Sequence, residues 1–436
     1  MNALLLASLI LSPLAGSSLT VEDPIPAALA KISPKRLMAD VETLVGFGTR
    51  HTLSDTRSSE RGIGAARRWL YDEFETISRA NGHRLQVREQ RFLINIRGKE
   101  AELVNIYGFL PGRDKDSNAR TYVVSGHYDS IPSGGMDAET DAPGADDDAS
   151  GTAVVLELAR VLAGGEYDAN LMFICVAGEE QGLFGSKHCA QQMHDDGVAI
   201  DGMITNDIVG GIEGGNGVRD ARTIRCFSRA ENGLHSASRS LARAMSASAK
   251  RYTPAAKLKL IFRLDRFGRG GDHKPFDELG YPAIRMTEAN EHYARQHKDV
   301  GTRDGIEYGD LPAFVSADYM ALVASVNGAC LAELALAPAP PSPPGLLAAM
   351  SYDTQVYWEP VEGAAGYEVV WRDTTSPDWE HVRAVGTETT EVRTRRGRKQ
   401  AVSINIEGVT ADSNFFGVRS LSASGHRSRV IVPERP

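Results

Sequence analysis

The sequence predicts an α/β protein, a three-layer α/β/α sandwich around a mostly parallel mixed sheet, followed by a small C-terminal all-β sandwich. Apolar, strand-like runs alternate with helix-like runs as far as Leu336, which is typical of helices packed on both faces of a parallel sheet. Beyond that point, short alternating segments separated by turn residues indicate a β-sandwich. The length of 436 residues also favours two domains over one.

The first domain is expected to span residues 34–336. Apolar residues recur at helical spacing in three stretches, so helices are predicted around residues 69–77, 154–162 and 311–336. A continuous apolar run at residues 121–126 predicts a buried strand. Further strands are predicted at residues 171–176, 202–209 and 257–263.

A proline-rich linker, residues 337–345, is expected to join the two domains as a semi-rigid spacer, because five prolines fall between Pro338 and Pro344. The second domain is expected at residues 346–436. Its order of motifs, W-E-P at Trp358, then GYEVVW, then FFGVRSLSASG, resembles that of a fibronectin type III module. This resemblance covers the last fifth of the chain.

Residues 1–20 are predicted to be a signal peptide. The run from Ala3 to Leu11 is almost wholly apolar, small residues follow it, and it is shorter than the roughly 20 residues that cross a bilayer. The protein is therefore expected to be secreted or periplasmic, without a stable membrane span; a hydrophobic N-terminal arm is the alternative. None of the four cysteines forms a CxxC pair, and pairing of Cys189 with Cys226 stays open.

The net charge of −9, from 48 basic and 57 acidic residues, argues against nucleic acid as a partner. One dense basic run lies in the C-terminal module. A solvated loop is the ordinary interpretation of such a run, and contact with an anionic cell-surface polymer is the alternative. The run consists of Arg393, Arg395, Arg396, Arg398 and Lys399.

Acidic residues and histidines follow the predicted strands at the points where each strand ends. In parallel sheets, ligands bind beyond these carboxyl ends. Several carboxylates close together repel one another unless a cation compensates them, and oxygen and imidazole ligands suit zinc, with manganese or cobalt as alternatives. The residues concerned are His127, Asp129, Glu179, Glu180, Asp207 and the acidic run at 146–148.

Three motifs in this region resemble the M28 family of zinc peptidases, which are mostly co-catalytic aminopeptidases. They are S-G-H-Y-D-S at 125–130, P-G-A-D-D-D-A-S-G at 143–151 and G-E-E-Q-G-L-F-G-S at 178–186. The resemblance extends over residues 34–336. It implies two Zn²⁺ ions per chain and peptide substrates.

The resemblance also implies roles for individual residues. Glu179 resembles the general base, and Asp129 would hold the His127 ring as a hydrogen-bond acceptor. Asp147 would bridge the two ions. The full set of metal ligands implied in this way is His127, Asp147, Glu180, Asp207 and His297.

Neighbouring residues have simpler interpretations. His297 fits the family pattern better than His292, and Asp146 and Asp148 are expected to be caps of the following helix. Gly271 stands where related enzymes often have serine before Asp-His.

The predicted function is that of a secreted dinuclear zinc exopeptidase, an aminopeptidase in which metal-activated water attacks the peptide and Glu179 acts as general base. Glutaminyl cyclisation with a single zinc ion is the main alternative, and the presence of His127 argues against it. A non-catalytic peptide-binding protein on the same fold is the other alternative, and it would require a missing ligand or base.

Overall fold

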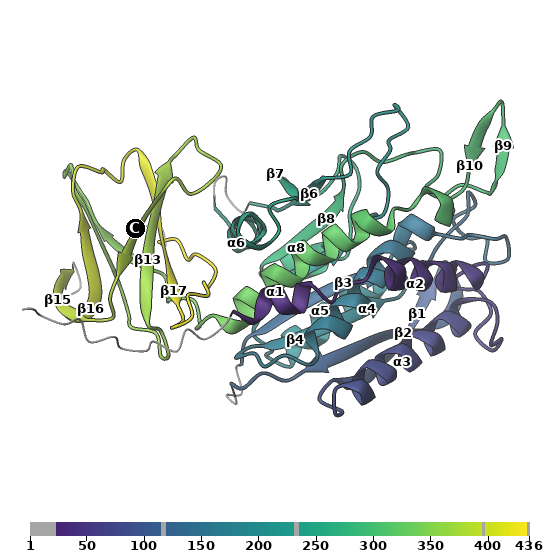
Figure 1. Ribbon diagram of the computed structural model, residues 1–436, viewed down its shortest axis with the longest axis horizontal. Coiled ribbons are helices and arrows are strands. Elements are labelled where there is room, and N and C mark those ends of the chain that lie inside the picture. Colours follow the sequence, from purple (N-terminus) through teal and green to yellow (C-terminus); the bar gives the residue numbers. More distant parts are fainter. Residues whose placement is uncertain (1–22, 115–118, 231–234, 395–396, 434–436) are drawn as a thin grey trace, which may run out of the picture.

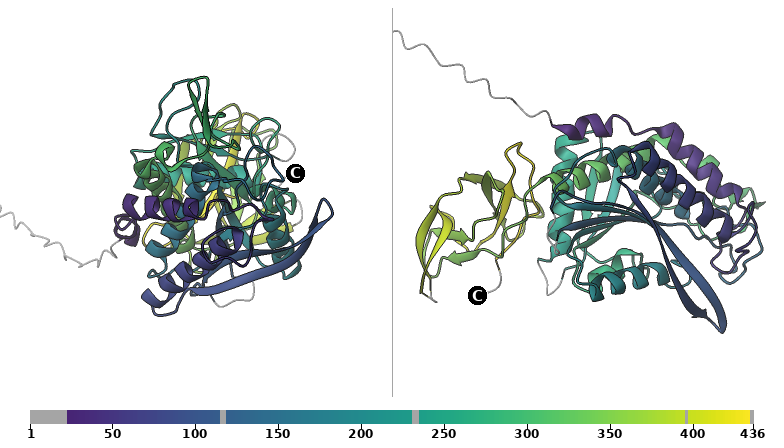
Figure 2. Two further views of the ribbon diagram at one scale, coloured as in Figure 1. Left: turned by 90° about the vertical axis from the view of Figure 1, so that its right-hand side faces the viewer. Right: turned by 90° about the horizontal axis from the view of Figure 1, so that it is seen from below.

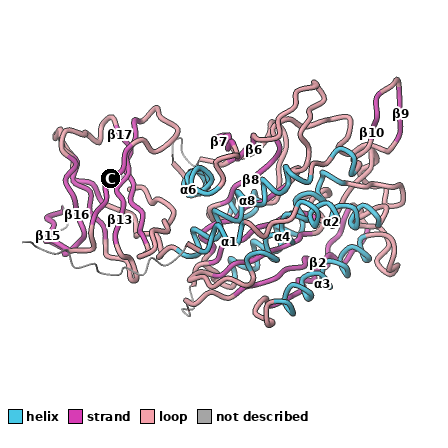
Figure 3. The backbone as a smooth tube through the Cα atoms, viewed as in Figure 1, coloured by secondary structure: helices cyan, strands magenta, loops and turns pink. Residues whose placement is uncertain are grey.

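The computed structural model describes residues 23–114, 119–230, 235–394 and 397–433, and the predicted signal peptide lies outside them. Two units follow one another along the chain (Figure 1). The first mixes helices and strands, and the second is built of strands (Figure 3). The predicted fold class is confirmed: an α/β unit around a large mixed sheet is followed by small antiparallel sheets.

The first unit is organised around an eight-stranded sheet in the order β1-β2-β4-β3-β5-β8-β6-β7. The central strands β4, β3, β5 and β8 run parallel, whereas β1 and β2 pair antiparallel at one edge and β6 runs antiparallel to β8. The strands are β1 (Gln86–Ile96), β2 (Lys99–Leu110), β3 (Thr121–His127), β4 (Asn170–Val176), β5 (Ile200–Asn206), β6 (Thr223–Phe227), β7 (Lys257–Ile261) and β8 (Ala283–Glu288).

Helices cover both faces of this sheet (Figure 2). One face packs against α1 (Pro24–Leu29), α2 (Pro34–Gly46), α3 (Ile63–Ala80), α4 (Gly151–Leu162), α6 (Ala237–Tyr252) and α8 (Ala317–Leu336). The other face packs against α5 (Phe184–Asp195) and α7 (His273–Glu278). Strand residues alternate between the two cores: Val124 and Phe173 enter the first, Val123 and Ile174 the second. All seven residues of β3 are buried, as its continuous apolar run predicts.

The long C-terminal helix of this unit begins later than the sequence predicts. Pro312 opens a short 3₁₀ turn, η2 (Pro312–Phe314), and α8 starts at Ala317, where the Ser316 hydroxyl accepts the Tyr319 amide as an N-cap. Among the described residues, α8 is the single helix long and apolar enough to cross a bilayer, and 78% of its apolar window is buried inside the protein.

The second unit contains two antiparallel sheets, β11-β12-β16-β15 and β14-β13-β17. Its core includes Trp358 and Tyr367, whose rings meet edge to face with centroids 5.2 Å apart. The strands are β11 (Gly345–Leu347), β12 (Thr354–Trp358), β13 (Gly366–Asp373), β14 (His381–Val385), β15 (Thr389–Thr394), β16 (Gly397–Ile406) and β17 (Asn414–Leu421). A hairpin of β9 (Gly301–Arg303) and β10 (Ile306–Tyr308) projects from the first unit.

The second unit is docked against α6 of the first. The Arg243 Nε donates to the Pro377 carbonyl at 2.6 Å, and Lys250 pairs with Asp378 at 3.0 Å. The linker takes part in this packing, because the Ser420 hydroxyl donates to the Ala339 carbonyl at 2.5 Å. The predicted spacer is therefore held between the two units rather than free. All four cysteines are buried and unpaired, so Cys189 and Cys226 do not form a disulfide.

Candidate metal centre

The acidic residues and histidines singled out in the sequence gather at the carboxyl edge of the parallel strands. His127 is the last residue of β3, and Asp207 directly follows β5. Glu180 lies in the turn between β4 and α5, and Asp147 lies in the short segment η1 (Ala145–Ser150) that precedes α4. Because β4, β3 and β5 are neighbours in the sheet, their ends bring these side chains together.

Two sets of ligand atoms share the carboxylate of Asp147. His127, Asp147 and Asp207 form one set, and Asp147, Glu180 and His297 form the other, with the ligand atoms of each set within 4.8 Å of one another. His127 Nε2 lies 3.1 Å from Asp147 Oδ1, and His297 Nε2 lies 3.0 Å from Asp147 Oδ2. One carboxylate therefore faces both sets, one oxygen toward each.

The donors fit divalent metal ions. The buried atoms Glu180 Oε1 and His297 Nε2 have no hydrogen-bond partner, although they lie 3.0 Å from one another. Buried polar atoms are normally hydrogen-bonded, so atoms that approach one another without hydrogen-bond geometry indicate a place for a cation between them. Imidazole and carboxylate donors without thiolate suit zinc.

His297 is the histidine that reaches the centre. The alternative histidine, His292, belongs to neither ligand set. The His297 side chain keeps 36% of its surface exposed, whereas His127 is 1% exposed. The His297 side of the centre is therefore the one that faces solvent.

Asp129 is buried and supports the centre in two ways. Its carboxylate lies 3.6 Å from His127 Nδ1, and the hydrogen-bond partner of that nitrogen is the Asp129 backbone carbonyl at 3.2 Å. The carboxylate also accepts the backbone amides of Glu179 and Glu180, each at 3.2 Å. One carboxylate thus ties the histidine at the end of β3 to the turn after β4.

Asp148 caps the helix that follows it, as the sequence predicts, and makes further contacts at the centre. Its carboxylate accepts the Gly151 amide at the start of α4, at 2.9 Å, and it is fully buried. It also accepts the His127 amide at 3.0 Å and the Ile208 amide at 3.3 Å, so it joins three of the segments that carry ligands. Asp310, which no sequence motif marks, also supports the centre, because its carboxylate accepts the Asp147 amide at 2.7 Å.

Burial and mutual repulsion perturb the acids of this edge. Burial raises the pKa of Glu179 well above its ordinary value of 4.5, and nearby acids reinforce the shift. Burial, with repulsion from Asp147, raises the pKa of Glu180 to about 7. Burial raises the pKa of Asp272 to about 7, and its carboxylate accepts the Ser186 hydroxyl at 2.5 Å. Raised pKa values of this kind are typical of a cluster of acids whose negative charge a bound metal ion compensates.

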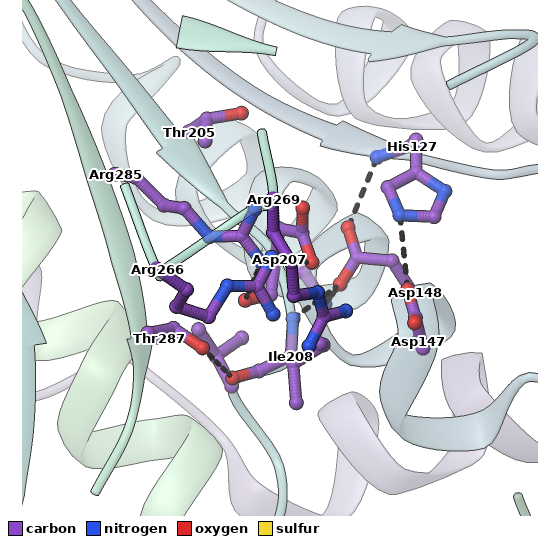
Figure 4. Close-up of polar contacts among 12 residues, drawn as sticks. His127, Asp147, Asp148, Thr205, Asp207, Ile208, Arg266, Arg269, Arg285 and Thr287 are labelled. Atoms are coloured by element: carbon purple, nitrogen blue, oxygen red, sulfur yellow. Dashed lines mark hydrogen bonds and ion pairs between the residues drawn. The ribbon is translucent and has the colours of Figure 1, made fainter. Parts of the chain in front are cut away.

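An arginine on β8 contacts one of the candidate ligands. Arg285 is fully buried, and its Nη2 lies 2.7 Å from Asp207 Oδ1 (Figure 4). Its Nη1 lies 3.3 Å from Asp265 Oδ2. A Cβ atom at position 271 would lie 2.5 Å from Arg285 Nη1, so a larger residue there would require the guanidinium to shift. Arg285 belongs to none of the sequence motifs, and its signal in the sequence is a charged residue inside the apolar strand run AIRM.

Comparison with known proteins identifies the family to which the chain belongs. The sequence pattern described as Peptidase family M28 matches residues 105–319. A protein of Pyricularia oryzae named "Probable zinc metalloprotease" is 39% identical over 437 residues, an alignment that covers 93% of this chain and 84% of that protein. The chain belongs to peptidase family M28. It is a zinc metallopeptidase, as the sequence motifs predict.

Solved structures share the fold of the first unit. The LapA aminopeptidase of Legionella pneumophila matches with a TM-score of 0.54 and 20% identity, over 72% of this chain and 75% of that one. A glutaminyl cyclase of Fimbriiglobus ruber matches with a TM-score of 0.53 and 18% identity, over 69% of this chain and 95% of that one. At these identities the likeness shows a shared fold alone, and this fold occurs in an aminopeptidase and in a glutaminyl cyclase.

Proposed function

We propose that this M28 peptidase is a dinuclear zinc aminopeptidase. The observation that carries the proposal is the Asp147 carboxylate, which places one oxygen 3.1 Å from His127 Nε2 and the other 3.0 Å from His297 Nε2. His127 and Asp207 would complete one zinc site, and Glu180 and His297 the other. A glutaminyl cyclase with a single zinc ion would not require a complete set of ligands at the site that includes His127.

Zinc in these two sites supplies Lewis acidity toward the peptide carbonyl and lowers the pKa of water toward neutrality. The chain's own contribution is proton transfer and orientation. Glu179, whose pKa burial raises, accepts the proton of the attacking water on its carboxylate and delivers it to the leaving amine nitrogen. Asp129 holds the His127 ring and the backbone of Glu179 in place.

Two variants separate the proposed roles. Glu179→Gln should retain zinc and lose nearly all turnover, because it removes the base and leaves the ligands in place. Asp147→Asn should lose zinc, measured by elemental analysis of the purified protein. Substantial turnover by Glu179→Gln would remove its role as the base.

The substrate class is tested with free and N-acetylated aminoacyl anilides, assayed after chelation and again after zinc is returned. We expect cleavage of the free substrates alone, because a free α-amino group is cationic and the site is lined by carboxylates. Equal cleavage of blocked and free substrates would contradict the aminopeptidase assignment. Cyclisation of N-terminal glutaminyl peptides by protein that holds one zinc ion would favour the cyclase instead.

We also propose a domain division and a location. Residues 34–336 form the peptidase domain, 337–345 the linker and 346–436 a module of fibronectin type III type. Residues 1–20 direct export, so the protein acts outside the cytoplasm. N-terminal sequencing of protein recovered from outside the cytoplasm tests this, because a chain that still begins at residue 1 would contradict cleavage.

The C-terminal module is a candidate for contact with anionic cell-surface polymer. Of its basic run, Arg395 and Arg396 lie outside the described residues, while Arg398 pairs with Glu391 at 3.0 Å and Lys399 with Glu359 at 3.7 Å. The described part of the run is not a loop, because Arg393 lies in β15 and Arg398 and Lys399 lie in the paired strand β16. The ion pairs leave the run partly neutralised, which argues against the contact. Deleting residues 345–436 and measuring surface retention tests the contact, since unchanged retention rules it out.

A further inference from the structure

A cavity of about 550 Å³ borders the candidate metal centre on the side of Glu180. It lies between the tip of the β1–β2 hairpin, the loop at residues 134–137 and the turn that precedes α5. Its volume falls within the range of roughly 300–1,000 Å³ that small-molecule sites occupy. No step of the mechanism above uses this cavity.

The walls of the cavity combine an apolar surface with one basic side chain. Ile96, Met136 and Phe184 line it, and the latter two are half-buried against the main core. Arg97, at the tip of the hairpin, lines it as well. Glu180 forms its inner border, where the candidate zinc site begins.

We propose that this cavity binds the residue that follows the scissile bond, and that Arg97 binds the carboxylate of that residue. The inference rests on the proposed aminopeptidase function and specifies its substrate class. The preferred substrates are dipeptides, in which the second residue carries both an apolar side chain for the cavity wall and a free C-terminal carboxylate for the arginine.

The charges of the cavity support this assignment. Arg97 makes no ion pair within the part of the chain that the structure describes. The neighbouring acid Asp137 is already engaged, because its carboxylate accepts the backbone amides of Glu139 at 2.9 Å and Thr140 at 3.0 Å. Glu180 belongs to the candidate zinc site. Arg97 is therefore the charge in this cavity that lacks a protein partner, and a guanidinium binds a carboxylate with paired, charge-assisted hydrogen bonds.

The backbone at the hairpin tip gives an independent indication. Ile96 pairs with Lys99, so Arg97 and Gly98 form a two-residue turn in which both have positive φ, 51° and 89°. Such turns favour asparagine or glycine at the first position, because a side chain in the left-handed region is strained. Arginine is a poor choice for the turn itself, and strain of this kind indicates a functional role for the side chain.

The test compares the dipeptide Leu-Leu with its C-terminal amide, both with a free amino group, on the zinc-loaded protein. The natural chain is expected to prefer the free acid by about tenfold in kcat/KM, the equivalent of one charge-assisted hydrogen bond of about 1.4 kcal/mol. Arg97→Asn, which suits the left-handed turn, should bring this ratio near one by raising KM for the free acid. Arg97→Lys should keep part of the preference.

The matched control is Arg88→Gln, which removes a positive charge from an exposed position on the same hairpin, away from the cavity. It should leave the ratio unchanged. Equilibrium binding of Leu-Leu to the Glu179→Gln protein, measured by calorimetry, gives a readout that does not depend on turnover. Adding Arg97→Asn to that protein should weaken binding about tenfold.

A third substrate, Leu-Glu-amide, identifies the source of the carboxylate. If Arg97→Asn lowers kcat/KM for this peptide and not for Leu-Leu, the arginine binds an acidic side chain instead of the C-terminal carboxylate, and the inferred preference for dipeptides is overturned. An acid-to-amide ratio that is the same in the natural chain and in Arg97→Asn would also overturn the inference. If none of the free-amino peptides is cleaved by any of these proteins, the proposed function itself has failed.

Discussion

Replacing Glu291 with glutamine is expected to destabilise the loop that carries His297. The carboxylate of Glu291 is surrounded by three arginines: Oε1 lies 2.7 Å from Arg225 Nη2, and Oε2 lies 2.9 Å from Arg266 Nη1 and 2.5 Å from Arg269 Nη1. Arg225 belongs to β6, and the other two arginines follow β7. These ion pairs fasten the His297 loop to the sheet.

The magnitude follows from the pKa of Glu291. Burial alone would raise it, but Arg266 and Arg269 lower it from the ordinary 4.5 to about 2. Since one pKa unit corresponds to about 1.4 kcal/mol, the ionised carboxylate contributes about 3 kcal/mol to stability at neutral pH. Because the pKa of the folded state is depressed, this contribution is present above about pH 4.5 and is lost as the pH falls toward 2.

Urea unfolding of metal-free protein measures the effect as the difference in unfolding free energy between the natural chain and Glu291→Gln. We expect about 3 kcal/mol at pH 7, shrinking as the pH falls below about 4.5. The control is Glu278→Gln, because Glu278 is 48% exposed and pairs with Lys274 at 3.7 Å, so its loss should cost less than 1 kcal/mol. A difference below about 1 kcal/mol for Glu291→Gln, or one independent of pH, would refute the reasoning.

Three further predictions concern the metal centre and the contact between the units. Arg285→Met should lower the unfolding free energy of the metal-free protein by about 3–5 kcal/mol in urea, because it leaves Asp207 and Asp265 buried without their cation. Zinc should reduce this loss of stability. An equal loss with and without zinc would contradict the role assigned to Asp207. Chelation should lower the melting temperature and zinc should restore it, since ligands of the folded state stabilise it; a melting curve that chelation leaves unchanged argues against the centre. Arg243→Ala removes the donor to the Pro377 carbonyl and the guanidinium that lies 6.0 Å from the Trp379 ring. It should therefore speed proteolysis at the linker. An unchanged rate of proteolysis would show that docking of the two units does not depend on Arg243.

The central strands and the residues at their ends could be predicted from the sequence because their signals are local. β3 and β4 are continuous apolar runs, and the histidine and acids that follow such runs necessarily meet at one edge of a parallel sheet. The β1–β2 hairpin escaped prediction. Most residues of β1 are exposed or half-exposed, so no buried face marks it in the sequence.

The supporting residues of the centre could not be predicted because they act across long stretches of chain. Asp310 meets the amide of Asp147 from 163 residues away, and Arg285 approaches the backbone of Asp207 from 78 residues away. Neither contact leaves a periodic pattern. The cap contact of Asp148 could be predicted, whereas its burial could not, because that burial depends on β3 and on the segment after β5.

The central claim is that one carboxylate, that of Asp147, serves two zinc ions. Anomalous X-ray diffraction at the zinc edge, from crystals of the zinc-loaded protein, tests it directly. The account predicts two peaks flanking Asp147, one beside His127 and Asp207 and the other beside Glu180 and His297. A single peak at full zinc loading, or peaks away from Asp147, would contradict it.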